Sequence, residues 1–298
     1  NLYDPVSYIL TLKGKRLRPI LTLMAADIFS DSYKPGLDAA LAVEVFHNFS
    51  LVHDDIMDSA ELRRGNKTVH KKWNVSTGIL SGDVMLIQAY QLFENYEGEV
   101  FVDLAKLFSK TAIEVCEGQQ YDVDFETRDD VKIADYLKMI TYKTAVLLGA
   151  SMKMGAIIAR ANKDDQNKIY DFGKYLGIAF QLQDDYLDAF GDESKFGKKI
   201  GGDILENKKT FLYLKAIEFL GEKNKSQLLA LYSNNNISEE KIIKAKVLFK
   251  ESGSVDYTIK EIKKYTNSAF EILESLNISN EKKKLLYEFG NSLMDRNI

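Results

Sequence analysis

Residues 41–58 (LAVEVFHNFSLVHDDIMD) carry apolar side chains at intervals of three and four residues and end in a cluster of acids. Residues 170–188 (YDFGKYLGIAFQLQDDYLD) repeat both features. Apolar residues at this spacing line one face of an α-helix. Each stretch is therefore predicted to be a helix that bears carboxylates near its C-terminal end.

The two acidic clusters have the same internal spacing. Their members are Asp54, Asp55 and Asp58 in the first cluster, and Asp184, Asp185 and Asp188 in the second. At about 100° per residue, the first and third aspartates share one stripe of the helix, while the second points to the side. Carboxylates this close repel one another, so two copies of the pattern indicate a strongly positive ligand. Mg²⁺ that is bound by oxygen ligands and bridges to phosphate fits this description.

The rest of the chain supports an all-α fold. The three prolines, Pro5, Pro19 and Pro35, all lie near the N-terminus, so the strongest helix breaker is absent beyond them. No alternating run bounded by turn signals predicts a strand. We predict a single domain over residues 1–298, a bundle of about 10–13 helices around a central cavity. Because the chain starts at Asn1, we expect the native N-terminus to be missing.

The spacing of apolar residues and the turn-forming residues set the expected boundaries. Helices are predicted over residues 6–12, 16–29, 36–59, 75–95, 99–121, 130–140, 144–161, 165–190, 208–221, 224–232, 238–249, 254–275 and 280–294. Loops are predicted over residues 31–35, 63–74, 192–203, 233–237 and 275–279.

Composition narrows the class of protein. Hydrophobic residues make up 45% and charged residues 28% of the 298 residues, and the net charge of −4 argues against bulk nucleic-acid binding. The single cysteine, Cys116, excludes an internal disulfide framework, and we expect a cytoplasmic protein. The most apolar stretch, residues 144–161, is interrupted by Lys153 and Arg160, which favours a buried helix over stable membrane insertion.

Basic residues bracket both acidic clusters in the sequence. They occur at Lys15 and Arg18, at Arg63 and Arg64, at Lys143 beside Thr144, at Lys198 and Lys199, and at Lys208 and Lys209. Each alone would be a solvated side chain, but together they suggest two diphosphate pockets, because such donors bind phosphate oxygens. A Walker A sequence is absent, which argues against a P-loop nucleotide hydrolase, and the histidines do not form a zinc-protease pattern.

The order of these motifs resembles that of one enzyme family. The motifs are GKRLRP, HNFSLVHDDIMD, RRG, GQQYD, YKT, FQLQDDYLD, GKK and NKKT, within about residues 10–215. This pattern resembles the trans-isoprenyl diphosphate synthases (polyprenyl synthetases), which include farnesyl and geranylgeranyl diphosphate synthases. The resemblance implies an isoprenoid synthase fold, a homodimer and about three Mg²⁺ ions per active site. It also implies condensation of isopentenyl diphosphate with an allylic diphosphate, by ionisation, condensation and elimination.

The resemblance also implies roles for individual residues. Isopentenyl diphosphate would be bound by Lys15, Arg18, His47 and Arg64. The allylic diphosphate would be bound by Arg63, Lys143, Gln181, Lys198 and Lys208, with Thr144 beside the forming cation. Direct magnesium ligands would be Asp54, Asp58 and Asp184, assisted by Asp55, Asp122, Asp185 and Asp188. The cavity would be lined by Gln119 and Phe180.

The chemistry of the residues agrees with these roles. Breaking an allylic C–O bond creates a carbocation and a diphosphate, and metal ions with lysine or arginine donors stabilise the departing charge. The cation needs a dry cavity with aromatic faces and hydroxyl dipoles, which Phe180, Tyr142 and Thr144 can supply. The departing diphosphate is close enough to accept the proton that is lost, so no side chain needs to act as the base.

Residues before the first acidic cluster bear on product length. Phe49 and Ser50 stand five and four residues before Asp54, and an aromatic followed by a small residue resembles geranylgeranyl diphosphate synthases. A second aromatic in place of the serine would favour farnesyl diphosphate, which is the alternative main product. On a helical wheel Phe49 lies about 140° from Asp54, and Phe46 and Ser50 lie nearer to the metal stripe. The floor of the cavity can therefore involve Phe46 or other helices, and Phe49 can be ordinary core.

Three other functions remain open at this point. A terpene cyclase would share the first cluster but usually carries an Asn/Ser/Glu-type second metal motif, unlike Asp184–Asp188. A non-catalytic partner subunit of a heteromeric synthase would be marked by lost aspartates. A metal carrier without catalysis would not need Arg63-Arg64 or Lys143-Thr144.

We predict that Phe49→Ala lengthens the product, because removing the ring opens space along the growing tail. Chromatography of the reaction products measures the chain length. A product of unchanged length would exclude Phe49 from the floor of the cavity.

Overall fold

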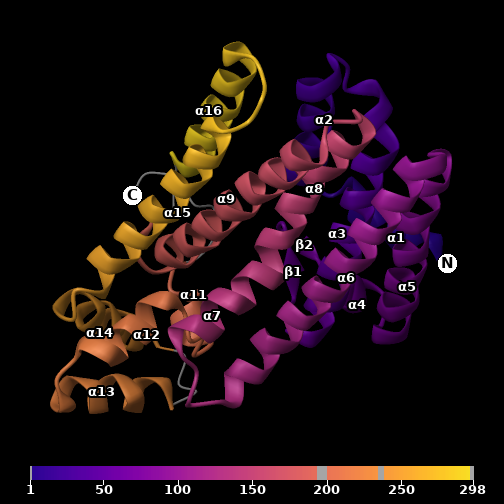
Figure 1. Cartoon of the computed structure of the whole chain (residues 1–298). Helices are drawn as coiled ribbons and strands as arrows, with labels where there is room; N and C mark the ends of the chain where they lie inside the picture. Colours follow the sequence, from indigo (N-terminus) through magenta and orange to yellow (C-terminus); the bar gives the residue numbers. More distant parts are fainter. Residues whose placement is uncertain (1, 193–199, 234–237, 296–298) are drawn as a thin grey trace. The chain divides into compact units, whose positions relative to one another are not determined.

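Helices dominate the protein. The computed structural model describes residues 2–192, 200–233 and 238–295, and 81% of it is helical (Figure 1). The prediction of an all-α fold is confirmed. No helix in the described part of the chain has both the length and the apolarity needed to cross a bilayer.

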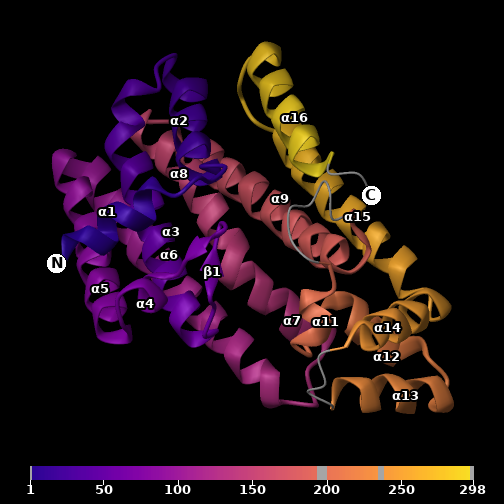
Figure 2. The same cartoon turned by 180° about the vertical axis from the view of Figure 1, so that it is seen from behind.

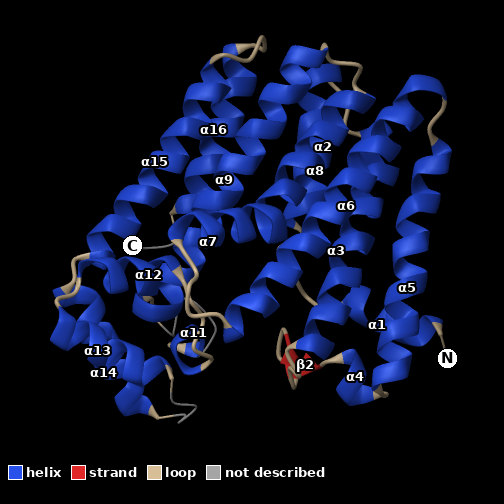
Figure 3. Ribbon diagram, turned by 60° about the horizontal axis from the view of Figure 1, so that its bottom comes forward, coloured by secondary structure: helices blue, strands red, loops and turns tan. Residues whose placement is uncertain are grey.

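One predicted loop contains regular structure. Within and beside the predicted loop over residues 63–74, strands β1 (Leu62–Arg63) and β2 (Asn66–Lys67) form a small antiparallel hairpin, drawn in red in Figure 3. A short helix, α4 (Val69–Lys72), follows. Arg64 and Gly65 at the tip have φ angles of 55° and 77°. Two consecutive positive φ angles are those of a tight hairpin turn, and the Arg-Gly pair gave no hairpin signal in the sequence.

The chain divides into two compact units. Unit 1 comprises residues 1–111 and 150–170, and unit 2 comprises residues 112–149 and 171–298. The prediction of a single domain stays a prediction.

Unit 1 is built on the helix that ends in the first acidic cluster. Its elements are α1 (Tyr3–Thr11), α2 (Leu17–Ser30), η1 (Lys34–Gly36), α3 (Leu37–Met57), the hairpin, α4, α5 (Val75–Gln91), η2 (Leu92–Asn95), and parts of α6 (Gly98–Thr127), α8 (Val146–Ile158) and α9 (Lys163–Phe190). Helix α3 packs against both α2 and α5. The predicted helix over residues 36–59 is therefore α3, and α1, α2 and α5 lie close to their predicted ranges.

Aromatic rings fill the core of unit 1. The ring of Phe108 makes edge contacts with Phe46, Tyr90 and Phe93, at centroid distances of 5.1, 4.7 and 5.0 Å. Such edge-to-face pairs contribute about 0.5–1.5 kcal/mol each beyond the area they bury. Phe46 is fully buried, so the periodic apolar face predicted for this stretch is the face that meets the core.

Unit 2 carries the second acidic cluster. Its elements are the second parts of α6 and α9, α7 (Ile133–Ile140), η3 (Thr141–Ala145), the start of α8, α11 (Gly202–Leu205), α12 (Phe211–Phe219), α13 (Glu222–Tyr232), α14 (Glu239–Glu251), α15 (Ser254–Glu274) and α16 (Asn280–Met294). Helix α15 packs on α12, α14 and α16, which Figure 2 also shows. The last two predicted helices match α15 and α16 to within one residue.

A π-helical turn interrupts the path from α7 to α8. This segment, η3, spans Thr141–Ala145 and so carries Lys143 and Thr144. Two glycines let other helices approach it closely. A Cβ atom on Gly118 of α6 would lie 2.2 Å from the backbone nitrogen of Lys143, and one on Gly177 of α9 would lie 2.7 Å from Cα of Ala145. Such π-turns occur often at functional sites, and this one is held between helix backbones that only glycine permits.

We predict that Gly118→Ala destabilises the protein. The new methyl group would collide with backbone atoms that cannot rotate away, and overpacking of this kind costs about 1–3 kcal/mol. That cost exceeds the gain of about 1 kcal/mol that alanine brings to a helix. The free energy of unfolding in urea measures the effect. Gly221→Ala is the control, because a Cβ there meets no atom within 4 Å. Equal stability of the two variants would contradict the close approach.

Candidate active site

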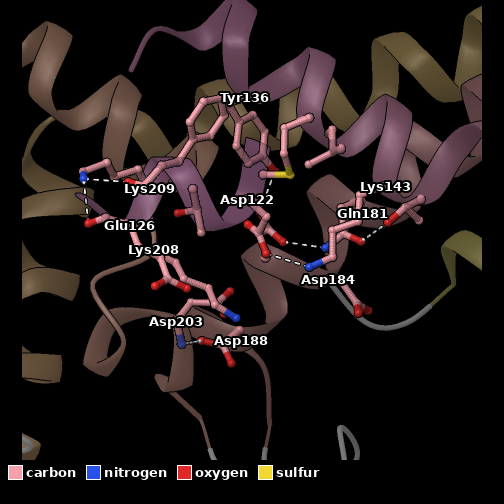
Figure 4. Close-up of a pocket in the computed structure, with 16 residues that line it drawn as sticks. Asp122, Glu126, Tyr136, Lys143, Gln181, Asp184, Asp188, Asp203, Lys208 and Lys209 are labelled. Carbon is pink, nitrogen blue, oxygen red and sulfur yellow. Dashed lines mark hydrogen bonds and ion pairs between the residues drawn. The ribbon is translucent and has the colours of Figure 1, made fainter. Parts of the chain in front are cut away.

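A cavity of about 200 Å³ lies in unit 2 where the second acidic cluster ends α9 (Figure 4). Its acidic lining consists of Asp122, Glu126, Asp184, Asp185, Asp188 and Asp203. Its basic lining consists of Lys143, Lys208 and Lys209. The structure thus brings together residues that the sequence placed in four separate motifs: GQQYD, YKT, FQLQDDYLD and NKKT.

Lysines offset the carboxylates on two sides of the cavity. The Nζ of Lys143 donates to Oδ2 of Asp122 at 2.6 Å. The Nζ of Lys208 lies 3.6 Å from Oδ1 of Asp203 and 3.0 Å from Oε2 of Glu206. Burial alone would lower the pKa of Lys208, but the carboxylates of Asp203 and Glu206 outweigh it, so the pKa is raised and Lys208 stays a cation.

Lys209 bonds to backbone carbonyl oxygens, unlike Lys208. Its Nζ donates to the backbone carbonyl oxygen of Phe125 at 2.8 Å and to that of Glu126 at 3.3 Å. Both carbonyls lie near the C-terminal end of α6, where backbone acceptors lack helical partners. Lys209 therefore closes the end of a helix, while Lys208 faces the acids.

Hydrogen bonds hold the buried member of the second acidic cluster. Asp185 accepts from the hydroxyl of Tyr136 at 2.5 Å through Oδ2, and from Nε2 of Gln181 at 2.9 Å through Oδ1. The hydroxyl of Thr144 donates to Oε1 of Gln181 at 3.0 Å. Burial and the charge of Asp203 raise the pKa of Asp185 well above its ordinary value, and the two hydrogen bonds oppose that rise.

Asp188 fixes the start of α11. Its Oδ2 accepts from the backbone N–H of Asp203 at 3.0 Å, and its carbonyl oxygen accepts from Gly201 at 2.7 Å. Gly201 has a φ of 85°, a conformation that favours glycine. Asp203, which the sequence did not single out, enters the cavity because of this turn.

The carboxylates of the cavity suit a hard divalent cation that is bound by protein carboxylates and by substrate phosphates together. Within the described residues, no three acidic, histidine or cysteine side chains are gathered so as to enclose a metal ion by themselves. Mg²⁺ usually takes one or two carboxylates and completes its shell with water and substrate phosphates. Asp122, Asp184 and Asp188 offer oxygen donors around one open cavity, which suits that mode of binding.

The first acidic cluster belongs to unit 1 and divides into two environments. Asp54 is half-buried and Asp58 is exposed, whereas Asp55 is fully buried. Oδ1 of Asp55 accepts from Nε and Nη2 of Arg63 at 2.9 and 2.5 Å. Burial raises the pKa of Asp55, and the hydrogen bond from Arg63 opposes the rise. Arg63 of strand β1, which is predicted to bind the allylic diphosphate, thus forms an ion pair with Asp55.

Three of the four residues predicted for isopentenyl diphosphate meet in unit 1. Nη1 of Arg18 lies 3.2 Å from Nε2 of His47. Burial, with Arg64 nearby, lowers the pKa of Arg18 to about 10, and burial with Arg18 and Arg64 lowers the pKa of His47 well below its ordinary value. The Nε of Arg18 is buried without a hydrogen-bond partner in the described part of the chain. Lys15, the fourth residue, is exposed ahead of α2.

Arg16 and Glu44 support this basic group, and the sequence did not single them out. Nη1 of Arg16 donates to Oε1 of Glu44 at 2.6 Å, and its Nη2 donates to the carbonyl oxygens of Leu10 and Leu12 at 2.6 and 2.8 Å. Arg16 has a φ of 48°, so it turns back to bind α1 just before α2 begins. No sequence signal separates it from Lys15 and Arg18, because the three cations lie within four residues.

The candidate floor residues lie on α3. Phe46 is fully buried against Phe108. The ring of Phe49 contacts Phe46 at 5.5 Å and His53 at 4.8 Å, and His53 Nε2 lies 3.2 Å from the carbonyl oxygen of Ile79 on α5. The hydroxyl of Ser50 donates to the carbonyl oxygen of His47 at 2.9 Å. His53 is therefore directed to α5, and Phe49 packs against Phe46 and His53 on the same helix.

The remaining predicted residues divide as follows. Gln119 is buried, and neither atom of its amide group has a hydrogen-bond partner within the described residues. Phe180 is half-buried on α9. Lys198 and Lys199 lie outside the described residues.

Comparisons with known proteins agree with this site. A family model described as polyprenyl synthetase matches residues 1–248. The geranylgeranyl diphosphate synthase of Sulfolobus acidocaldarius is 38% identical, over 97% of this chain and 90% of the relative. A geranylfarnesyl diphosphate synthase of Natronomonas pharaonis is 34% identical, over 99% and 90%.

A solved structure agrees in fold and sequence. A crystal structure of a geranylgeranyl pyrophosphate synthase superposes with a TM-score of 0.94 at 56% identity, covering 98% of this chain and 91% of the other. The family resemblance seen in the motifs is thereby confirmed. With a match over most of its length and relatives that cover it almost completely, the chain belongs to the polyprenyl synthetase family.

Proposed function

We propose that this prenyltransferase condenses isopentenyl diphosphate with an allylic diphosphate, head to tail, and that its main product is geranylgeranyl diphosphate. The observation that carries the proposal is the cavity of unit 2, where Asp122, Asp184 and Asp188 stand beside Lys143 and Lys208. Carboxylates that can bind metal ions, next to lysine side chains, form the set of ligands and donors that a diphosphate needs.

In this proposal the allylic diphosphate is bound beside the second acidic cluster. Mg²⁺ held by Asp184 and Asp188, with Asp122, would neutralise the charge that develops on the departing diphosphate. Lys143 and Lys208 donate to the diphosphate oxygens from this chain, and Lys198 stays a predicted third donor. The Thr144 hydroxyl lies at the cavity wall, where a positive charge on the allyl group would develop.

Isopentenyl diphosphate is bound in this proposal by Arg18, His47 and Arg64, with Lys15 at the exposed edge. The depressed pKa values of Arg18 and His47 come from burial and from crowding by like charges. An anion with two or more charges relieves that crowding, because it returns the interactions that burial removed. The lowered pKa of His47 makes its imidazole neutral near pH 7, so the ring has one nitrogen that donates a hydrogen bond and one that accepts.

The bonds balance without a base from the protein. The allylic C–O bond breaks and its electron pair leaves with the diphosphate. The double bond of isopentenyl diphosphate then forms the new C–C bond, and a proton from the adjacent carbon passes to the departed diphosphate.

Two observations favour a product of the length of geranylgeranyl diphosphate. Relatives named geranylgeranyl diphosphate synthase match the chain along nearly its whole length, and Phe49 followed by Ser50 resembles that subgroup. Farnesyl diphosphate is the alternative, and one relative named for geranylfarnesyl diphosphate makes a longer product the third outcome of a product assay. The single cysteine supports a cytoplasmic location.

We also propose that the protein is a homodimer through α5. Four large apolar side chains of this helix are well exposed: Val75, Ile79, Leu80 and Ile87, at 49, 43, 58 and 58%. Exposed apolar patches of this kind mark interaction surfaces, and a two-fold dimer buries the same patch on both subunits.

Ile87→Glu should convert the dimer into monomers, because a dimer would bury two added carboxylates without partners. Sedimentation velocity measures the mass. Ile243→Glu on α14 is the matched control, since Ile243 is also 58% exposed, and it should leave the dimer intact. A dimer that survives Ile87→Glu would contradict an interface at α5.

The condensation itself is tested with Mg²⁺, labelled isopentenyl diphosphate and each allylic primer. Asp184→Asn should lower kcat about 10²-fold or more, because a charged oxygen donor is lost at the reacting diphosphate. Removing Mg²⁺ with a chelator should abolish the reaction. Arg18→Gln should instead raise KM for isopentenyl diphosphate about tenfold. Asp164→Asn, at an exposed pair with Lys168 on α9, is the control and should change neither constant.

Absence of product with every primer would refute the proposed function and leave a non-catalytic subunit. Full activity of Asp184→Asn would remove the unit 2 cavity from the reaction.

A further inference from the structure

Four side chains of unit 2 form a hydrogen-bond chain that leads from a buried tyrosine to the cavity wall. The Tyr136 hydroxyl donates to Asp185 at 2.5 Å, and Nε2 of Gln181 donates to the other carboxylate oxygen at 2.9 Å. The Thr144 hydroxyl donates to Oε1 of Gln181 at 3.0 Å. The chain runs through α7, α9 and η3, and its members surround the same cavity (Figure 4).

Tyr136 stands at the closed end of this chain. It is 1% exposed, and its ring packs near Phe211 at a centroid distance of 6.2 Å. A phenylalanine would fill the same space, so packing alone does not explain the hydroxyl group. A buried tyrosine hydroxyl is costly unless it is hydrogen-bonded, and here its partner is Asp185, the buried carboxylate of the second acidic cluster.

The bonds at Asp185 decide which way the Gln181 amide faces. Both carboxylate oxygens accept hydrogen bonds, one from Tyr136 and one from Gln181. The NH₂ group of Gln181 is therefore directed to Asp185, and its carbonyl oxygen must face Thr144. A carbonyl oxygen can only accept, so the Thr144 hydroxyl must donate its hydrogen to Gln181.

The orientation of Thr144 follows from that last bond. With its hydrogen directed to Gln181, the hydroxyl oxygen keeps its lone pairs for the cavity. A lone pair facing the cavity stabilises positive charge, whereas a hydroxyl hydrogen in the same place would oppose it. The direction of these three hydrogen bonds thus sets the sign of the dipole that a substrate meets.

We propose that Tyr136 is a positioning residue that fixes the direction of this chain, so that Thr144 presents its oxygen lone pairs to the positive charge on the allylic substrate. The inference rests on the proposed function, because only a reaction with a cationic intermediate gives this orientation a purpose. Although Tyr136 is among the residues that line the cavity, its hydroxyl group is directed to Asp185. It acts through Asp185 and Gln181.

Tyr136→Phe removes only the hydroxyl oxygen and leaves the ring in place. We expect kcat for condensation to fall about tenfold, less than the 10²–10³ found when a direct donor is removed, with KM for both diphosphates unchanged within about twofold. Tyr213→Phe is the matched control. Tyr213 is also a buried tyrosine of unit 2, stacked on Tyr232, and it does not line the cavity. Its removal should leave kcat unchanged.

A binding measurement separates the dipole from a merely structural role. The two probes are allylic diphosphate analogues, one with a positively charged ammonium nitrogen in place of the cationic carbon, and one neutral with a thio-linked diphosphate. Calorimetry with Mg²⁺ should show that Tyr136→Phe weakens the ammonium analogue about tenfold and leaves the neutral analogue unchanged. Equal weakening of both, or of neither, would overturn the inference.

A double-mutant cycle tests the connection to Thr144. Thr144→Ser should keep the selectivity for the ammonium analogue, and Thr144→Val should lose it. Adding Tyr136→Phe to Thr144→Val should then cost little more, because residues that act through one chain are not additive. Fully additive losses would show that Tyr136 acts elsewhere. Gln181→Glu, which cannot donate to Asp185, supplies the same test if Tyr136→Phe does not fold.

The proposed function and this inference fail in different ways. If the unmodified enzyme makes no prenyl product, the function is wrong. If it makes product and prefers the ammonium analogue, but Tyr136→Phe keeps that preference, the function stands and the role of Tyr136 is wrong.

Discussion

Like charge in a small space is the constraint on which the site of unit 2 depends. Two carboxylates about 4 Å apart repel by roughly 4 kcal/mol at the effective dielectric constant of a protein surface, and a solvated salt bridge returns at most about 1 kcal/mol. Hydrogen-bond donors and cations that meet the acids around the cavity offset this repulsion. Lys143 bonds Asp122, Lys208 approaches Asp203, and Asp185 accepts from Tyr136 and Gln181. The same crowding makes the cavity attractive to divalent cations.

Basic side chains instead gather at one place in unit 1. Arg16, Arg18 and Arg64 gather near His47, and Glu44 is the carboxylate that bonds Arg16. The acid-rich cavity of unit 2 and the basic group of unit 1 correspond to the two substrates proposed above, since one diphosphate would be bound through metal ions and the other by cationic side chains directly. A terpene cyclase would not need this basic group, because it does not bind a second diphosphate substrate.

Sequence patterns predicted most of the fold because they act locally. Apolar spacing of three and four residues sets a helix wherever no breaker intervenes, and α3, α9, α15 and α16 follow their predicted ranges. The hairpin at Leu62–Lys67 was missed because its turn is Arg-Gly rather than Asn-Gly. The π-turn at Thr141–Ala145 was missed because it depends on close contacts with Gly118 and Gly177, which lie far from it in the sequence.

By itself, the sequence determined the helical class, the two acidic clusters and the family, since each of these is written in residue types at fixed spacing. Only the tertiary structure decided which members of the clusters differ in role. Asp184 and Asp185 are neighbours in the chain and both line the cavity, yet Asp184 is half-buried, whereas Asp185 is buried and accepts hydrogen bonds from Tyr136 and Gln181. A side chain's hydrogen-bond partners come from other helices, and no local pattern of residues encodes them.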